Sequence, residues 1–183
     1  MADGAAFAMN RTAPAFLIRR HRAGATRSFA AYSSCGRYRY GLMRRWAAGP
    51  ALLYVMLNPS TATELANDPT IERCERRARA LGYAAFGVVN LFAFRATRPR
   101  DLTQAEDPVG PLNEAAILLA LRHAGDVLCA WGAHGGHRGQ DQRVLALLRG
   151  AARPLLHLGL TRSGAPRHPL YVAYARAPEI WSN

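Results

Sequence analysis

The chain has 183 residues, half of them apolar, and 24 basic residues against 12 acidic ones give a formal net charge of +12. That length suits one domain with a single sizeable core. No apolar run approaches the ~20 residues of a membrane-spanning helix, and the N-terminus lacks the residue order of a secretory signal. We therefore expect a cytoplasmic, monomeric protein with no membrane partner.

All the basic side chains counted here are arginines, because the chain contains no lysine. A basic excess of this size attracts polyanions, of which nucleic acid is the most common. Three widely spaced cysteines fit neither a disulfide framework nor a four-cysteine cluster. His134 and His137 lie three residues apart among glycines, with no third ligand nearby. We expect DNA as the partner, and neither a metal nor another cofactor.

The N-terminal part of the chain differs in pattern from the rest. Residues 1–28 mix alanine, glycine and arginine without a clear period, which predicts a basic arm that could be disordered. Residues 29–183 are expected to form one domain. In residues 29–46, Tyr38 and Tyr40 alternate with Arg37 and Arg39, which indicates a strand or a hairpin with the arginines on the polar face.

Apolar runs and helical patterns then alternate along the chain. Strands are predicted at residues 51–57, 86–92, 126–131 and 154–160, and helices near residues 69–81, 111–124 and 137–148. Parallel strands joined by helices form right-handed crossovers. The predicted fold class is α/β: a three-layer α/β/α sandwich with a four-stranded parallel central sheet, plus an N-terminal strand or hairpin.

Polar residues follow the predicted strands. The first strand runs into Leu57-Asn58-Pro59-Ser60-Thr61, the second carries Asn90 and Phe92, the third precedes His134, and Arg167-His168-Pro169 comes after the fourth. Each segment alone is more typical of an ordinary turn. In open α/β sheets, however, ligands bind beyond the carboxyl ends of the strands, so together these residues predict a ligand site.

These segments resemble two groups of proteins. Leu57-Asn58-Pro59, Asn90, residues 128–134 and His168-Pro169 are similar, in order and spacing, to motifs of the uracil-DNA glycosylase superfamily. The chain also resembles a widespread group of small bacterial proteins of unknown function, through residues 58–62, 68–70 and 168–170. The first resemblance implies a hydrolase of base-excision repair that removes uracil or another modified pyrimidine from DNA.

The resemblance and the chemistry of glycosidic hydrolysis suggest roles for individual residues. Asn58 would hold the attacking water, and a neutral His168 would donate to O2 of the leaving base. Asp68 is interpreted as a helix cap, as a carboxylate that polarises the water, or as both. Substrate contacts are expected from Leu57, Pro59, Ser60, Thr61, Asn90, Phe92 and Pro169. DNA contacts are expected from Arg95, Arg98, Arg100, His134, Arg162 and Arg167.

Several residues depart from the glycosylase motifs. Met56 replaces a glycine, Asn58 replaces an aspartate found in many members, and Leu170 replaces a small residue. The stretch from residue 60 to residue 70 has no aromatic side chain to stack on a base. Two alternatives therefore stay open: a non-catalytic reader of modified bases, and a hydrolase of small nucleosides or nucleotides.

Overall fold

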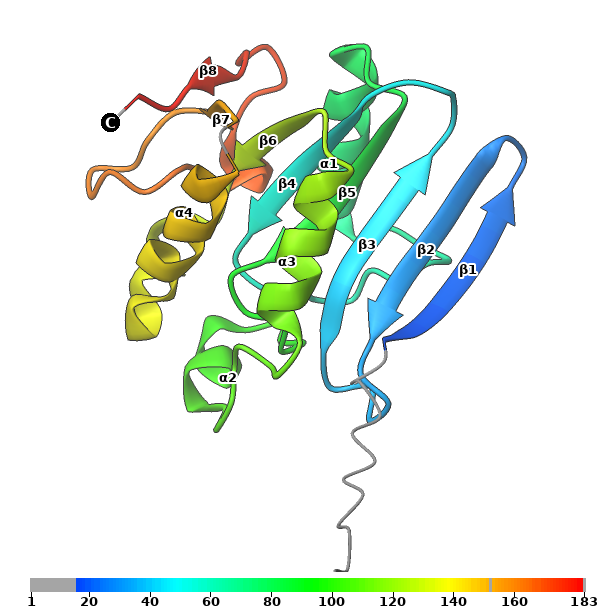
Figure 1. Cartoon of the computed structure of the whole chain (residues 1–183). Coiled ribbons are helices and arrows are strands. Elements are labelled where there is room, and N and C mark those ends of the chain that lie inside the picture. Colours follow the sequence, from blue (N-terminus) through cyan, green and yellow to red (C-terminus); the bar gives the residue numbers. More distant parts are fainter. Residues whose placement is uncertain (1–15, 152, 183) are drawn as a thin grey trace, which may run out of the picture.

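A computed structural model describes residues 16–151 and 153–182, and a sheet of eight strands runs through this part of the chain (Figure 1). The strand order is β1-β2-β3-β5-β4-β6-β7-β8. The strands are β1 (Leu17–Ala23), β2 (Thr26–Tyr32), β3 (Arg39–Arg45), β4 (Ala51–Met56), β5 (Ala85–Asn90), β6 (Asp126–Cys129), β7 (Leu155–His157) and β8 (Glu179–Ile180).

The sheet is mixed, and it is wider than the predicted sheet of four strands. Its middle strands β5, β4, β6 and β7 pair in parallel. At one edge β3 pairs with β5 in the antiparallel sense and carries β2 and β1 with it, while β8 pairs antiparallel with β7 at the other edge. The expected N-terminal hairpin is therefore part of the main sheet rather than an addition to it.

The boundary predicted at residue 28 falls inside β2. Residues 17–32 form a hairpin that turns at Gly24, whose positive φ of 57° favours glycine. Arg19, Arg20 and Arg22 of β1 obscured this strand in the sequence, because they interrupt the alternation of apolar and polar residues. Residues 1–15 of the predicted arm lie outside the described residues.

Helices cover both faces of the parallel strands. They are α1 (Pro69–Ala80), α2 (Pro99–Gln104), α3 (Asn113–Arg122) and α4 (Gln140–Gly150), with short 3₁₀ segments at Ala133–Gly139 and Pro169–Tyr171. The start of α1 is as predicted: Asp68 Oδ1 accepts a hydrogen bond of 2.9 Å from Ile71 N, and Pro69 occupies the first turn. The short α2 is not among the helices that the sequence predicted.

Side chains of β4 show how the layers are built. Leu52 and Tyr54 belong to the core cluster that includes α1, whereas Leu53 and Val55 belong to the cluster formed with α3 and α4. All six residues of β4 are buried, as expected for a parallel strand covered on both faces. No helix among the described residues is both long and apolar enough to cross a membrane.

A buried arginine attaches the C-terminal segment to α1. Arg77 is 3% exposed, and its two terminal nitrogens donate to the carbonyl oxygens of residues 172, 173, 174 and 176 at 2.7–3.3 Å. A guanidinium suits this task because its donors are arranged in a fixed planar fork. The segment that follows His168 is thereby held against the helix.

We expect Arg77→Met to lower the free energy of unfolding by about 2–4 kcal/mol, because it removes four hydrogen bonds to buried or half-buried backbone and takes the donor from the carbonyl oxygens of residues 174 and 176. Urea denaturation followed by circular dichroism measures the change. The matched control is Arg76→Met on the same helix, whose exposed ion pair with Glu72 contributes less than about 1 kcal/mol. Equal losses in the two variants would contradict the role assigned to Arg77.

Candidate functional site

A cavity of about 660 Å³ lies at the carboxyl ends of the parallel strands. Residues after β4, β5, β6 and β7 contribute to its lining, as the rule for open α/β sheets predicts. Eight of the residues expected at the site line this cavity: Leu57, Asn58, Ser60, Asp68, Asn90, His134, Arg167 and His168. The lining also includes Arg39, Thr97, Trp131, Thr161 and Tyr171, which the sequence did not single out.

Asn58 follows β4 and has a fixed amide orientation. Its Nδ2 donates to the carbonyl oxygens of Pro59 and Ala96, at 3.0 and 2.7 Å. Because two carbonyls can accept only from the nitrogen, both amide hydrogens are used and Oδ1 remains as the acceptor in the cavity. Asn58 can therefore hold a water molecule by accepting one of its protons.

Asn90 ends β5 and is 1% exposed, yet its Nδ2 has no hydrogen-bond partner in the protein. Its backbone oxygen accepts a hydrogen bond of 2.9 Å from Nδ2 of Asn113, the first residue of α3, and this bond fixes the position of the end of β5. A buried amide donor without a partner costs roughly 1–3 kcal/mol. Such a group is expected where a ligand supplies the missing acceptor.

His168 faces the same cavity as a neutral ring. Burial lowers its pKa to about 4, and the carboxylate of Asp68 opposes this shift only in part. Its Nδ1 accepts from Leu170 N at 3.4 Å, so the neutral ring carries its proton on Nε2. Gly132, with a positive φ of 73°, turns the chain after β6 against the base of this side chain. The result is an uncharged donor at the strand ends.

Asp68 serves as the helix cap that the sequence predicted, and it also lines the cavity. Its Oδ1 accepts from Ile71 N, and its Oδ2 accepts from Ala62 N at 3.3 Å. The backbone thus holds the carboxylate in place beside the cavity. A structural role and a role toward a ligand are compatible at this position.

Arg39 is the main residue of the cavity that the sequence missed. It begins β3, is 2% exposed, and donates from Nη1 to the carbonyl oxygen of Ala62. Burial lowers its pKa to about 10, so it remains charged at neutral pH. The alternation with Tyr38 and Tyr40 assigned Arg39 to a polar face, but the chain after β4 covers this face of the sheet.

Other predicted site residues lie outside the cavity lining. Phe92 is fully buried in the core formed with α3 and α4, and Pro59 and Pro169 are buried as well. Among the expected DNA contacts, Arg98 pairs with Asp101 at 3.2 Å, and Arg95 is half-buried with its guanidinium 5.7 Å from the ring of Tyr32. The exposed residues Thr61, Arg100 and Arg162 also lie outside the lining.

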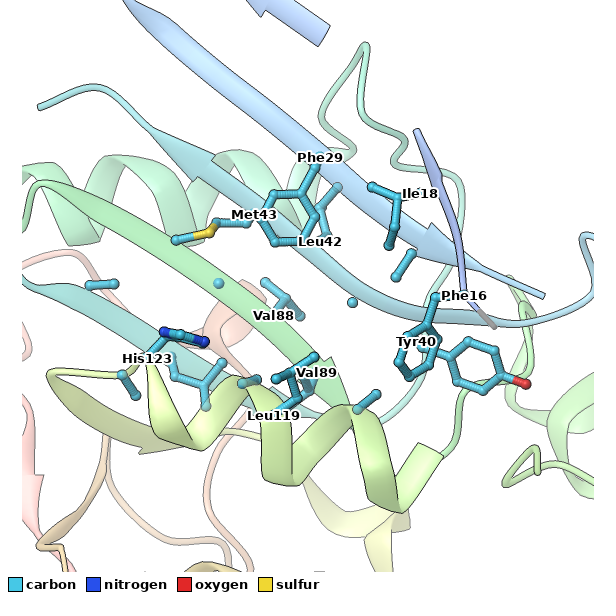
Figure 2. A pocket seen from close by; sticks show the side chains of 18 of the residues that line it. Phe16, Ile18, Phe29, Tyr40, Leu42, Met43, Val88, Val89, Leu119 and His123 are labelled. Atoms are coloured by element: carbon cyan, nitrogen blue, oxygen red, sulfur yellow. The ribbon is translucent and has the colours of Figure 1, made fainter. Parts of the chain in front are cut away.

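A second cavity, of about 500 Å³, has a different character (Figure 2). Figure 2 shows Phe29 and Met43 of the sheet on one side and Leu119 and His123, at the end of α3, on the other. Its lining is mostly apolar and lacks the convergent polar groups of a catalytic site. The cavity at the strand ends is therefore the better candidate for chemistry. No group of metal-ligating side chains occurs within residues 16–151 and 153–182.

Together, the fold and the cavity define an α/β protein with a partly polar cavity at the carboxyl edge of its parallel strands. A family described as "Protein of unknown function (DUF1643)" matches residues 39–170, and the chain belongs to this family. The match begins at Arg39 and ends at Leu170, so it spans the loops that form most of the cavity. No curated protein and no solved structure matches the chain.

The histidine gives a pH-dependent prediction. The pKa of His168 is about 4 in the folded protein and about 6.5 in an unfolded chain. The unfolded state therefore binds the proton first, and stability that is full above pH 6.5 is lost as the pH falls toward 4. Urea denaturation at several pH values measures the free energy of unfolding of the wild type and of His168→Gln. The difference between these two free energies should shrink as the pH falls from 6.5 to 4. A constant difference would contradict the assigned burial.

Proposed function

We propose that the protein is a DNA glycosylase that hydrolyses the N-glycosidic bond of uracil, or of another modified pyrimidine, after the base has left the stack. The observation that carries this proposal is the unpartnered amide of Asn90, 1% exposed, in the lining of the cavity. An amide presents donors and an acceptor to the N3 and O4 edge of a pyrimidine. That edge distinguishes uracil from cytosine.

The other polar groups fit the remaining parts of the reaction. The bond between C1′ of the sugar and N1 of the base breaks, and its electron pair stays on the base. His168 donates from Nε2 to O2 of the base and so stabilises this charge. Asn58 Oδ1 holds the water whose oxygen bonds to C1′, while Asp68 favours the positive sugar in the transition state. The water's proton passes to solvent or to the departing base.

Fold and charge add support to the proposal. The parallel strands β5-β4-β6-β7 bring Asn58, Asn90 and His168, from the segments that resemble the uracil-DNA glycosylase superfamily, to one cavity. The net charge of +12 favours a polyanionic substrate. Arg167 is exposed and lines the cavity, so it can contact a phosphate beside an extruded nucleotide.

A specific observation also favours the second candidate, a non-catalytic reader of modified bases. Both amide hydrogens of Asn58 are bonded to carbonyl oxygens, and an amide cannot take a proton from water at neutral pH. A reader would use the same cavity and would bind DNA without releasing a base. An assay for base release separates the two candidates.

The test is an oligonucleotide with one central uracil, single-stranded or paired with guanine, incubated with the protein in EDTA and then treated with hot alkali. We expect strand scission, reduced by roughly 10²–10³ in rate in Asn90→Ala and His168→Ala. The control is His123→Ala, which removes an imidazole at the second cavity and should leave the rate unchanged. Binding without scission on uracil and on other modified pyrimidines would favour the reader.

Phosphate contacts give a separate prediction for the rim of the cavity. The plot of log affinity against log salt concentration has a negative slope. In Arg167→Gln this slope should become less steep by about 0.9, the value for one phosphate contact. Fluorescence anisotropy with labelled duplex DNA measures the slope. Arg143→Gln, an exposed position on α4, is the matched control. Equal slopes in the two variants would exclude Arg167 from the DNA interface.

A further inference from the structure

Two buried polar side chains contribute to the lining of the cavity, and one of them is a cation. Arg39 and Asn90 are 2% and 1% exposed, whereas the other polar residues of the lining are half-buried or exposed. A nucleotide enters a pocket with its base first and leaves its phosphates outside. The deepest contacts of the cavity are therefore available to the base rather than to the backbone.

The charge of Arg39 has no paired counter-ion within the described part of the chain. No carboxylate oxygen there lies within ion-pair distance of its guanidinium. Asp68 is the acid that acts on it most strongly, but both Asp68 oxygens accept backbone N–H groups. Glu64 accepts from the hydroxyl of Tyr32 at 2.9 Å. A buried cation is normally paired with an anion or saturated with hydrogen bonds.

Two other buried arginines of this fold make more hydrogen bonds than Arg39 does. Arg77 has its four carbonyl partners, and Arg44 of β3 donates to the oxygens of Thr63, Ala66 and Asn67. Arg39 has one hydrogen bond, to the oxygen of Ala62. Its Nε is buried without a partner, as are Nη1 of Arg44 and Nε of Arg77, so the difference lies in the number of bonds made. Holding the loop after β4 therefore uses only part of the donor capacity of Arg39.

We propose that Arg39 and Asn90 together recognise a pyrimidine that carries negative charge on the edge opposite its glycosidic nitrogen. This inference rests on the proposed function and names its substrate class: a pyrimidine with an acidic substituent. Arg39 supplies the charge, and Asn90 supplies an amide donor beside it. A neutral pyrimidine of the same shape binds less tightly, because it leaves the buried cation without an anion.

The test compares two free bases of equal shape, 5-carboxyuracil and its uncharged isostere uracil-5-carboxamide, by titration calorimetry with the full chain in 0.15 M salt. We expect the carboxylate to bind roughly tenfold or more tightly than the carboxamide. This preference should fall to about twofold or less in Arg39→Met. It should persist in Arg44→Met, which removes a buried arginine of the same strand that lies outside the lining. Benzoate controls for unspecific attraction of anions by the net charge.

Each outcome has a definite meaning, including for a variant that fails to fold. In that case the affinities for the two bases are compared in the wild type and in Arg39→Lys, which keeps the charge. A preference for the carboxylate in both proteins supports the inference, and equal affinities for the two bases overturn it. If uracil and the carboxamide bind but the carboxylate binds no better, the inference is overturned and the proposed function stands. Benzoate binding as tightly as 5-carboxyuracil also overturns the inference. If no pyrimidine binds, the base pocket itself is wrong and both proposals fail.

Discussion

Buried arginines bonded to backbone carbonyl oxygens hold the loops that form the cavity. Arg39 and Arg44 extend from β3 to the loop between β4 and α1, and Arg77 extends from α1 to the segment that follows His168. These loops contain little regular structure, so their carbonyl groups need donors from elsewhere. A guanidinium supplies several donors from one side chain and stays charged when it is buried. The sheet places the strand ends, and the arginines fix the loops beyond them.

The same device explains why the cavity is polar where it is deepest. A residue that holds a loop from inside the protein brings its charge with it. At Arg44 and Arg77 the carbonyl oxygens take up most of the donors. At Arg39 the loop takes one donor, and the same guanidinium group belongs to a residue that lines the cavity together with Asn90. Loop positioning and ligand recognition can therefore share one side chain.

Elements with strong local signals could be predicted from the sequence. The apolar run of β4 and the Asp68-Pro69 start of α1 gave nearly correct positions, because burial on both faces and helix capping leave clear patterns. The two-residue strand β8 and the six-residue helix α2 are too short to show a period. Strand β1 is rich in arginine, and its place in the sheet depends on pairing with β2 rather than on its own pattern.

The residues of the candidate site also include some that the sequence could predict and one that it could not. Rules about the ends of parallel strands bring Asn58, Asn90 and His168 to one cavity, so these positions could be predicted from order and spacing alone. Arg39 could not, because an alternating strand pattern assigns its face to solvent when the covering segment is an irregular loop. Only the path of residues 57–68 over β3 shows that this face is buried.

The arrangement of these groups suggests how such a site would divide the chemical work. Asn58 can orient water but cannot deprotonate it, and His168 is held neutral by burial. Neither side chain supplies a strong base. Positive and donor groups instead converge from Arg39, Asn90 and His168 toward the space that a base would fill. A site of this kind favours departure of an electron-rich base over activation of the nucleophile, and the proposed reaction needs that balance when the sugar already carries most of the positive charge.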